Sequence, residues 1–176
     1  MMKVLTILAT FWLASMAFGQ KSVSELAPGH AAALENYLSA NKTLTFRQEH
    51  NLSDEYLKSV HEWFGKRFKP NYAVGDFNRD KITDFAVLVY REGKSEPSGA
   101  SGENNEHTPD YPLRLVVFNG AKKGYSVAYT TDLMGPHAAF IRFDKKLYYG
   151  IFETDSDNFM LTPAGRGYVM EFEKPR

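Results

Sequence analysis

Apolar positions along the chain change their spacing once, from a helical period to the pattern of β-strands. Residues 31–40 form an alanine-rich run with apolar side chains at helical spacing. A second helix is predicted after Ser53, which can serve as its N-cap, and it stops at Pro70. The apolar stripe of that helix consists of Tyr56, Leu57, Val60, Trp63, Phe64 and Phe68.

The second half of the chain has the pattern of strands. Residues 85–90 are a near-continuous run of β-forming apolar residues, which predicts a strand buried on both faces. A hairpin turn is expected from Asn119-Gly120 to Gly124, with a loop longer than the tightest type. Helices followed by strands indicate an α+β fold with a mainly antiparallel sheet of about five to seven strands. The other strands are expected at 113–118, 125–130, 138–143, 146–152, 158–161 and 168–172.

The N-terminus has the pattern of a signal peptide. A short basic start that includes Lys3 precedes an apolar stretch at 4–18, which is too short for a membrane-spanning helix. Ala17-Phe18-Gly19 is a small-x-small sequence of the kind that signal peptidase accepts. We therefore expect cleavage after Gly19, a periplasmic or secreted protein, and no membrane span after cleavage. An uncleaved N-terminal anchor is the alternative.

The remaining residues, 20–176, are expected to form one α+β domain. Their number falls within the usual size of a single domain. Residues 92–112 are low in complexity and have little to bury, so a mobile surface loop is expected there.

Charge and cysteine content exclude several classes of function. Lys plus Arg and Asp plus Glu both number 21, so the chain has no net charge. It therefore lacks the overall positive charge that is typical of proteins that bind nucleic acid. Removing residues 1–19 takes away one charge, that of Lys3. The chain has no cysteine, which excludes disulfides, thiol catalysis and cysteine-ligated zinc.

One acidic segment combines residue type and spacing in a way that suggests metal binding. Side-chain oxygens of Asp76, Asn78, Asp80 and Asp84 occupy positions 1, 3, 5 and 9, and the carbonyl of Ile82 lies at position 7. Hard cations such as calcium take six to eight oxygen ligands, and a curled loop turns every second side chain inward. The alternative is a tight turn in which the same side chains bond to the backbone and no metal is needed.

The segment Gly-Asp-Phe-Asn-x-Asp-x-x-x-Asp-Phe-Ala-Val-Leu, residues 75–88, resembles the motif of FG-GAP/VCBS-type repeats of exported bacterial proteins. The resemblance implies an acidic loop between two strands that binds calcium through the five residues named above. Arg79 and Lys81 stand where glycines are usual, and Lys81 is expected to need a positive φ. The motif occurs once, so the resemblance carries over a loop and not a propeller.

Two further groups of residues have chemistry to offer. Glu153, Asp155 and Asp157 are spaced two residues apart, so on a strand their carboxylates would share one face. Such carboxylates can act as acid and base in the hydrolysis of sugars, or they can simply form the solvated end of a strand. The strand-rich half also carries a set of tyrosines and arginines that suits either a binding face or cross-strand packing. These are Tyr125, Tyr129, Tyr148, Tyr149 and Tyr168, with Arg114, Arg142 and Arg166.

The sequence therefore favours a small exported protein that binds or stabilises a protein or glycan partner in the cell envelope. It favours a non-enzymatic role, with calcium as a structural ion. One alternative is a calcium-supported hydrolase of an envelope polymer that uses Glu153, Asp155 and Asp157. Another is a secreted inhibitor or immunity-type protein that presents residues 92–112 to its target.

Overall fold

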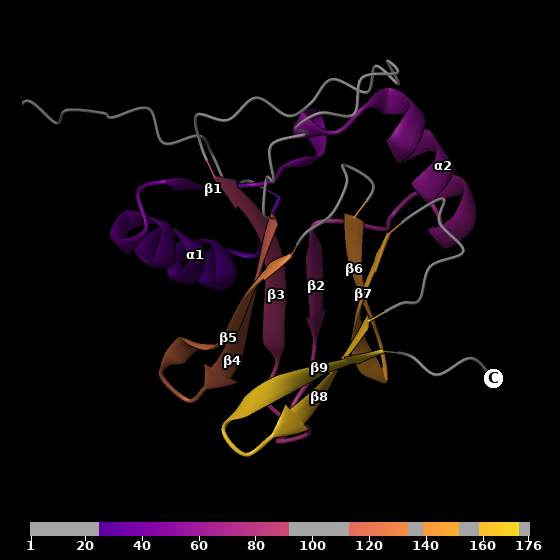
Figure 1. The fold of residues 1–176 in the computed structure, drawn as a ribbon. Coiled ribbons are helices and arrows are strands. Elements are labelled where there is room, and N and C mark those ends of the chain that lie inside the picture. Colours follow the sequence, from indigo (N-terminus) through magenta and orange to yellow (C-terminus); the bar gives the residue numbers. More distant parts are fainter. Residues whose placement is uncertain (1–24, 92–112, 134–138, 152–158, 173–176) are drawn as a thin grey trace, which may run out of the picture.

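The computed structural model describes residues 25–91, 113–133, 139–151 and 159–172 (Figure 1). In these ranges the chain forms helices α1 (Pro28–Ala40) and α2 (Asp54–Phe64) and a 3-10 turn, η1 (Glu49–Asn51). It also forms nine strands: β1 (Leu44–Phe46), β2 (Tyr72–Gly75), β3 (Asp84–Arg91), β4 (Leu113–Ala121), β5 (Gly124–Leu133), β6 (Ala139–Asp144), β7 (Lys146–Ile151), β8 (Phe159–Ala164) and β9 (Gly167–Phe172).

The strands form two antiparallel sheets. The first has the order β1-β3-β4-β5, with β2 also paired to β3, and the second is the meander β6-β7-β8-β9. The described residues therefore confirm the α+β class, with helices near the N-terminus and antiparallel strands after them. The strands form one sheet of five strands and one of four, whereas a single sheet of about five to seven strands was expected.

Strands β1 and β2 share one edge of β3 and meet at Leu88. Strand β4 takes the other edge, while β1 pairs with Val89–Arg91 and β2 pairs with Asp84–Val87. Between them, Arg47 N–H donates to the Leu88 carbonyl (3.1 Å), and Leu88 N–H donates to the Asn71 carbonyl (3.1 Å). Residues 48–70, which include α2, therefore leave this edge at Arg47 and return to it at Asn71.

The central strands of the five-stranded sheet, β3 and β4, are buried on both faces, because α1 covers one face and the second sheet covers the other (Figure 1). Every residue from Phe85 to Val89 is fully buried, which confirms the prediction from the continuous apolar run. Odd positions pack with Leu34 of α1, and even positions pack with Ile141, Leu147 and other residues of the second sheet. Alternation along β3 thus divides its side chains between two cores.

Helix α2 begins as the sequence predicts and ends earlier. Ser53 Oγ accepts a hydrogen bond from Tyr56 N–H (3.2 Å), so Ser53 is the N-cap. The helix stops at Gly65, whose φ of 91° closes it five residues before Pro70. The prediction that Trp63 belongs to the buried stripe is wrong, because this side chain is 77% exposed. It lies in the last turn, beyond Tyr56 and Val60, the two residues of α2 that are buried.

The β4–β5 hairpin also differs from the prediction. Both strands run further than expected, so that Ala121 pairs with Gly124 and only Lys122 and Lys123 lie between them. The predicted longer turn from Asn119-Gly120 is therefore wrong, because these residues pair with Ser126 and Tyr125 inside the ladder.

Some predictions fall outside the described residues. The signal peptide and its cleavage site at Gly19 do so, as do the predicted loop at 92–112 and the carboxylates Glu153, Asp155 and Asp157. Among the helices that the structure describes, none is both long and apolar enough to cross a membrane.

Candidate functional site

The predicted acidic loop joins β2 to β3 and lies at the end of the molecule that carries the hairpin turns (Figure 1). Two contacts tie the two sheets together at this end. The ring of Phe77 packs on Phe143 of β6, with centroids 5.1 Å apart, and Tyr168 Oη of β9 donates to Asn119 Oδ1 of β4 (2.6 Å). The β2–β3 loop, residues 76–83, thus packs through Phe77 on β6 of the second sheet, at the end where β9 is bonded to β4.

Asp84, the first residue of β3, is fully buried and fastens this loop to the sheet. Its Oδ2 accepts hydrogen bonds from the backbone N–H groups of Phe77 (2.8 Å) and Asn78 (3.3 Å). Its Oδ1 accepts from Gly120 N–H of β4 (2.8 Å). Burial raises the pKa of Asp84 above its ordinary value, and the three N–H donors oppose that rise. Asp84 therefore joins the loop, β3 and β4 through one carboxylate.

The other predicted ligands bond within the loop. Asp76 accepts from the backbone N–H groups of Asp80 (3.0 Å) and Lys81 (2.9 Å). Asn78 Oδ1 accepts from Asp80 N–H (2.9 Å), and Asp80 Oδ1 accepts from Ile82 N–H (2.8 Å). These bonds are those of a tight turn closed by its own side chains. The structure thus contains the side-chain-to-backbone bonds of the metal-free alternative.

The backbone of the loop adopts the left-handed conformation at two cationic residues. Arg79 has a φ of 64° and Lys81 a φ of 69°, which confirms the expectation that Lys81 needs a positive φ. A side chain disfavours this region by about 1–2 kcal/mol, whereas glycine enters it freely. The loop therefore carries side chains at two positions where glycine would be less strained.

Calcium binding by the loop stays a prediction. Within the four described ranges no three His, Cys, Asp or Glu side chains converge to hold a metal ion. The donor types nevertheless suit calcium, since Asp76, Asn78 and Asp80 present oxygens at the surface and each carboxylate has about four lone-pair sites. Asp84 differs from these three, because it is buried and already accepts three hydrogen bonds.

A pocket of about 200 Å³ lies beside the loop. Two buried residues, Phe77 and Leu161, form part of its wall, and the turn between β6 and β7 forms another part. The lining residues are Phe77, Asn78, Arg79, Lys145, Lys146, Leu161, Thr162 and Pro163. No local sequence pattern indicates this pocket, because its residues come from three separate segments.

The tyrosines and arginines of the strand-rich half do not form one face. Tyr149 and Tyr168 are buried between the sheets, and Tyr125 contacts α1 through His30. Tyr148 lies under Arg142, whose guanidinium carbon is 4.5 Å from the ring centroid. These contacts support the alternative of cross-strand and core packing.

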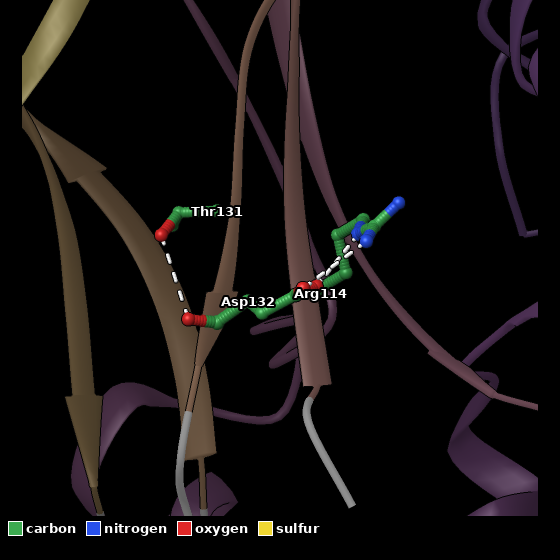
Figure 2. A network of polar contacts seen from close by, with 3 residues as sticks. All are labelled: Arg114, Thr131 and Asp132. Carbon is green, nitrogen blue, oxygen red and sulfur yellow. Dashed lines mark hydrogen bonds and ion pairs between the residues drawn. The ribbon is translucent and has the colours of Figure 1, made fainter.

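Arg114 is also held by a neighbour on the adjacent strand. Its Nε and Nη2 donate to the two carboxylate oxygens of Asp132 (2.7 and 3.1 Å), directly opposite on β5 (Figure 2). The hydrogen bond to Asp132 and a second to Tyr37 raise the pKa of Arg114. Figure 2 also shows the Thr131 hydroxyl directed at the Asp132 carbonyl, at 3.4 Å. This pair lies in register across β4 and β5, and because it is partly exposed it contributes little stability.

His30 is a buried polar residue whose role the sequence did not indicate. Its Nδ1 bonds to Tyr72 Oη and its Nε2 to Tyr125 Oη (2.8 Å), while its ring stacks on Phe85 at 4.4 Å. Burial lowers the pKa of His30. A neutral imidazole has one donor and one acceptor, so one tyrosine hydroxyl accepts and the other donates. His30 therefore connects α1 to β2 and β5.

A second buried polar group lies where β1 ends. The guanidinium of Arg47 is fully buried and donates through Nη1 to the Ala139 carbonyl (3.0 Å). Tyr56 Oη of α2 donates to the same carbonyl (3.0 Å). Burial raises the pKa of Tyr56 and of Tyr149, and the charge of Arg47 partly opposes this rise. These contacts join the edge of β3, α2 and the start of β6.

Comparison with known proteins adds no relative. No family model, no curated protein and no solved structure matches this chain.

Proposed function

We propose that the chain is an exported, non-enzymatic binding or structural protein of the cell envelope. In this proposal the end of the molecule with the β2–β3, β4–β5, β6–β7 and β8–β9 turns faces a protein or glycan partner. The N-terminal sequence pattern supports export, and the fixed turns support a role in binding. Recognition residues commonly lie on loops that a rigid scaffold positions.

The observation that carries this proposal is the attachment of the β2–β3 loop by Asp84. A surface loop of eight residues, 76–83, is closed by hydrogen bonds along its length and tied to β4 by a buried carboxylate. Holding the loop in one conformation lowers the entropy that binding would cost. A connection that served only to reverse the chain would need two residues, as in the β4–β5 hairpin.

Calcium forms part of the proposal as a structural ion. Asp76, Asn78 and Asp80, with the Ile82 carbonyl, would hold it at the surface of the loop, and Asp84 would complete the predicted set from inside. A bound cation would offset the mutual repulsion of these carboxylates and stabilise the loop. It would have no part in a reaction.

The proposal is tested by export and by retention on the envelope. Bacterial expression of the chain with its own N-terminus is expected to give an exported protein that begins at Gln20. This protein should sediment with one of two separately prepared fractions, membrane vesicles or cell-wall polymer. Reversing two charges of the β4–β5 turn, Lys122→Glu with Lys123→Glu, should weaken retention several-fold.

The matched control for these variants is Lys42→Glu, an exposed charge next to β1. Strand β1 pairs with the end of β3 opposite to Asp84, so this control should leave retention unchanged. An unprocessed protein in the cytosol would contradict export. Equal retention of the turn variants and the wild type would contradict a role for the turn end.

A further inference from the structure

We propose that the pocket between the β2–β3 loop and the β6–β7 turn binds a phosphate or sulfate group that ends a larger molecule. This inference rests on the proposed function, because it names the chemistry that the turn end would recognise. Three lines of observation support it: the charge of the lining, the conformation of two lining residues, and the size of the pocket.

The first line is charge. Arg79 from the loop, Lys145 from the β6–β7 turn and Lys146 at the start of β7 line a single small pocket. The whole chain has equal numbers of basic and acidic residues, so this group of three is a local excess of positive charge. Several cations around one recess favour an anion with more than one negative charge. The arginine fork and the point charges of lysine both suit oxyanions.

The three cations also have little else to bind. Within the ranges that the structure describes, none of them lies within 4 Å of a carboxylate oxygen. The neighbouring Asp144 instead faces Arg142, with Oδ2 and Nη1 4.0 Å apart. Lys146 Nζ donates to the thioether sulfur of Met160 (3.0 Å), which is a weak acceptor. A bound oxyanion would supply the strong acceptor that these groups lack.

The second line is backbone conformation. The described residues include three side-chain-bearing residues with positive φ, namely Arg79, Lys81 and Lys145. Two of these three, Arg79 at 64° and Lys145 at 59°, line the pocket from separate turns. Glycine would occupy such positions with less strain. Strained residues of this kind are concentrated at ligand sites, where the side chain has a use that offsets the strain.

The third line is size. A pocket of about 200 Å³ is smaller than the roughly 300–1,000 Å³ of sites that enclose a drug-sized ligand. It can take a tetrahedral oxyanion and the few atoms attached to it. Phe77, Leu161 and Pro163 provide an apolar surface for those atoms, whereas the side chains of Asn78 and Thr162 already donate to Asp80 Oδ2 (3.0 Å) and Glu171 Oε2 (3.2 Å). The bound group would therefore be the end of a molecule whose remainder stays outside the pocket.

The test is a titration of the purified protein, followed by calorimetry and by backbone amide chemical shifts. The probes are inorganic phosphate, sulfate, phenyl phosphate and acetate. We expect saturable binding of the doubly charged anions, weaker binding of acetate, and tighter binding of phenyl phosphate than of inorganic phosphate. The shifts of Phe77–Arg79 and Lys145–Lys146 should change most. Whichever of phosphate and sulfate binds more tightly indicates whether the natural ligand ends in a phosphate ester or in a sulfate ester.

Glycine variants separate the pocket from the fold. Arg79→Gly and Lys145→Gly should each weaken phosphate binding at least tenfold while the Tm stays equal or rises, because each removes a strained side chain. Lys81→Gly is the matched control, since Lys81 shares the positive φ but does not line the pocket. Lys81→Gly should leave phosphate binding unchanged, and its Tm should equal or exceed that of the wild type.

Two results would overturn the inference. One is the absence of saturable phosphate or sulfate binding by the wild type up to about 10 mM. The other is an equal loss in Lys81→Gly and in the pocket variants, which would indicate attraction by general charge. Loss of phosphate binding in Arg79→Gly with normal envelope retention would separate this pocket from the surface used in retention. The proposed function itself fails only through the export and retention experiments.

Discussion

Asp84 and Gly120, 36 residues apart, are joined by a buried hydrogen bond of 2.8 Å from the Gly120 N–H to Asp84 Oδ1. Gly120 also allows β4 to lie close to the end of the β2–β3 loop, because a Cβ atom at this position would lie 2.2 Å from the carbonyl oxygen of Thr83. The β2–β3 loop is therefore fastened to β4 by the Asp84 carboxylate, and it can lie this close to β4 because Gly120 has no side chain.

Replacing Asp84 should destabilise the fold. Asp84→Ala leaves the N–H groups of Phe77 and Gly120 without acceptors, at a cost of about 1–3 kcal/mol for each. Asp84→Asn keeps the size, but either orientation of the amide places an NH₂ group against a backbone N–H. Urea unfolding should show a lower free energy of unfolding for both variants than for the wild type. The exposed Asp80→Ala serves as the control and should cost much less.

An equal loss of stability in Asp80→Ala and Asp84→Ala would contradict this account. It would mean that closure of the loop, rather than its attachment to β4, provides the stability.

The contacts of His30 predict a dependence of stability on pH. Burial lowers the pKa of His30 below its ordinary value of 6.5. As the pH falls below 6.5, the unfolded chain takes up the proton first, so the free energy of unfolding decreases until the pH reaches the folded pKa. The protonated ring would also have to donate to both Tyr72 and Tyr125, which removes its one acceptor.

The comparison is with His30→Gln, which keeps a donor and an acceptor but does not titrate. The difference in free energy of unfolding between wild type and variant should shrink between pH 8 and pH 5. Histidine ring proton shifts report the folded pKa directly. A constant difference across this range would show that His30 titrates alike in both states.

Two buried tyrosines should respond in opposite directions to loss of their hydroxyl groups. Tyr149 Oη is buried and has no hydrogen-bond partner among the residues that the structure describes, whereas Tyr168 Oη donates to Asn119 Oδ1 (2.6 Å). Tyr149→Phe removes a buried polar group and should stabilise the protein by up to about 1 kcal/mol. Tyr168→Phe should destabilise it by about 0.5–1.5 kcal/mol. The measurement is the urea midpoint of each variant, and a loss in both would imply that Tyr149 binds ordered water.

The stability of the protein at alkaline pH provides a second measurement on Tyr149. Burial raises the pKa of Tyr149 to about 12, so above pH 10 the unfolded chain ionises first and the free energy of unfolding falls. Tyr149→Phe should lose less stability than the wild type between pH 10 and pH 12.

Calcium should raise the Tm of the purified protein, and magnesium should not. At a calcium concentration of about 100 times the dissociation constant, one site adds roughly 2.7 kcal/mol, which is several degrees for a domain of this size. Asp80→Ala should abolish the rise, because Asp80 is an exposed ligand of the predicted set. Equal melting in EDTA and calcium would leave the loop as a turn that needs no metal.

Local signals in the sequence predicted much of the fold. Ser53 caps α2, and the apolar run at 85–90 forms a strand buried on both faces. The division into two sheets was not predictable, because strand periodicity does not show which strands pair. The exposure of Trp63 was missed because its spacing fits the apolar stripe, although the helix there has passed beyond the core.

The candidate site was predicted only in part. The spacing of Asp76, Asn78 and Asp80 identified a loop of defined conformation. It did not distinguish Asp84, whose burial and bond to Gly120 depend on the pairing of β3 with β4. The partners of His30 lie 42 and 95 residues away in the chain. No local pattern can reveal contacts of that range.

The meeting of β1 and β2 at Leu88 has a consequence for how the domain can vary. Since residues 48–70 leave and rejoin the same edge at adjacent points, their length does not set the register of either strand. Loop closure for such a segment depends only weakly on the number of residues in it. The length of this segment can therefore change while β1 and β2 keep their pairing with β3, provided that the hydrogen bonds of Arg47 and Tyr56 to the Ala139 carbonyl are kept. This edge is thus the place in the scaffold where new sequence can be grafted.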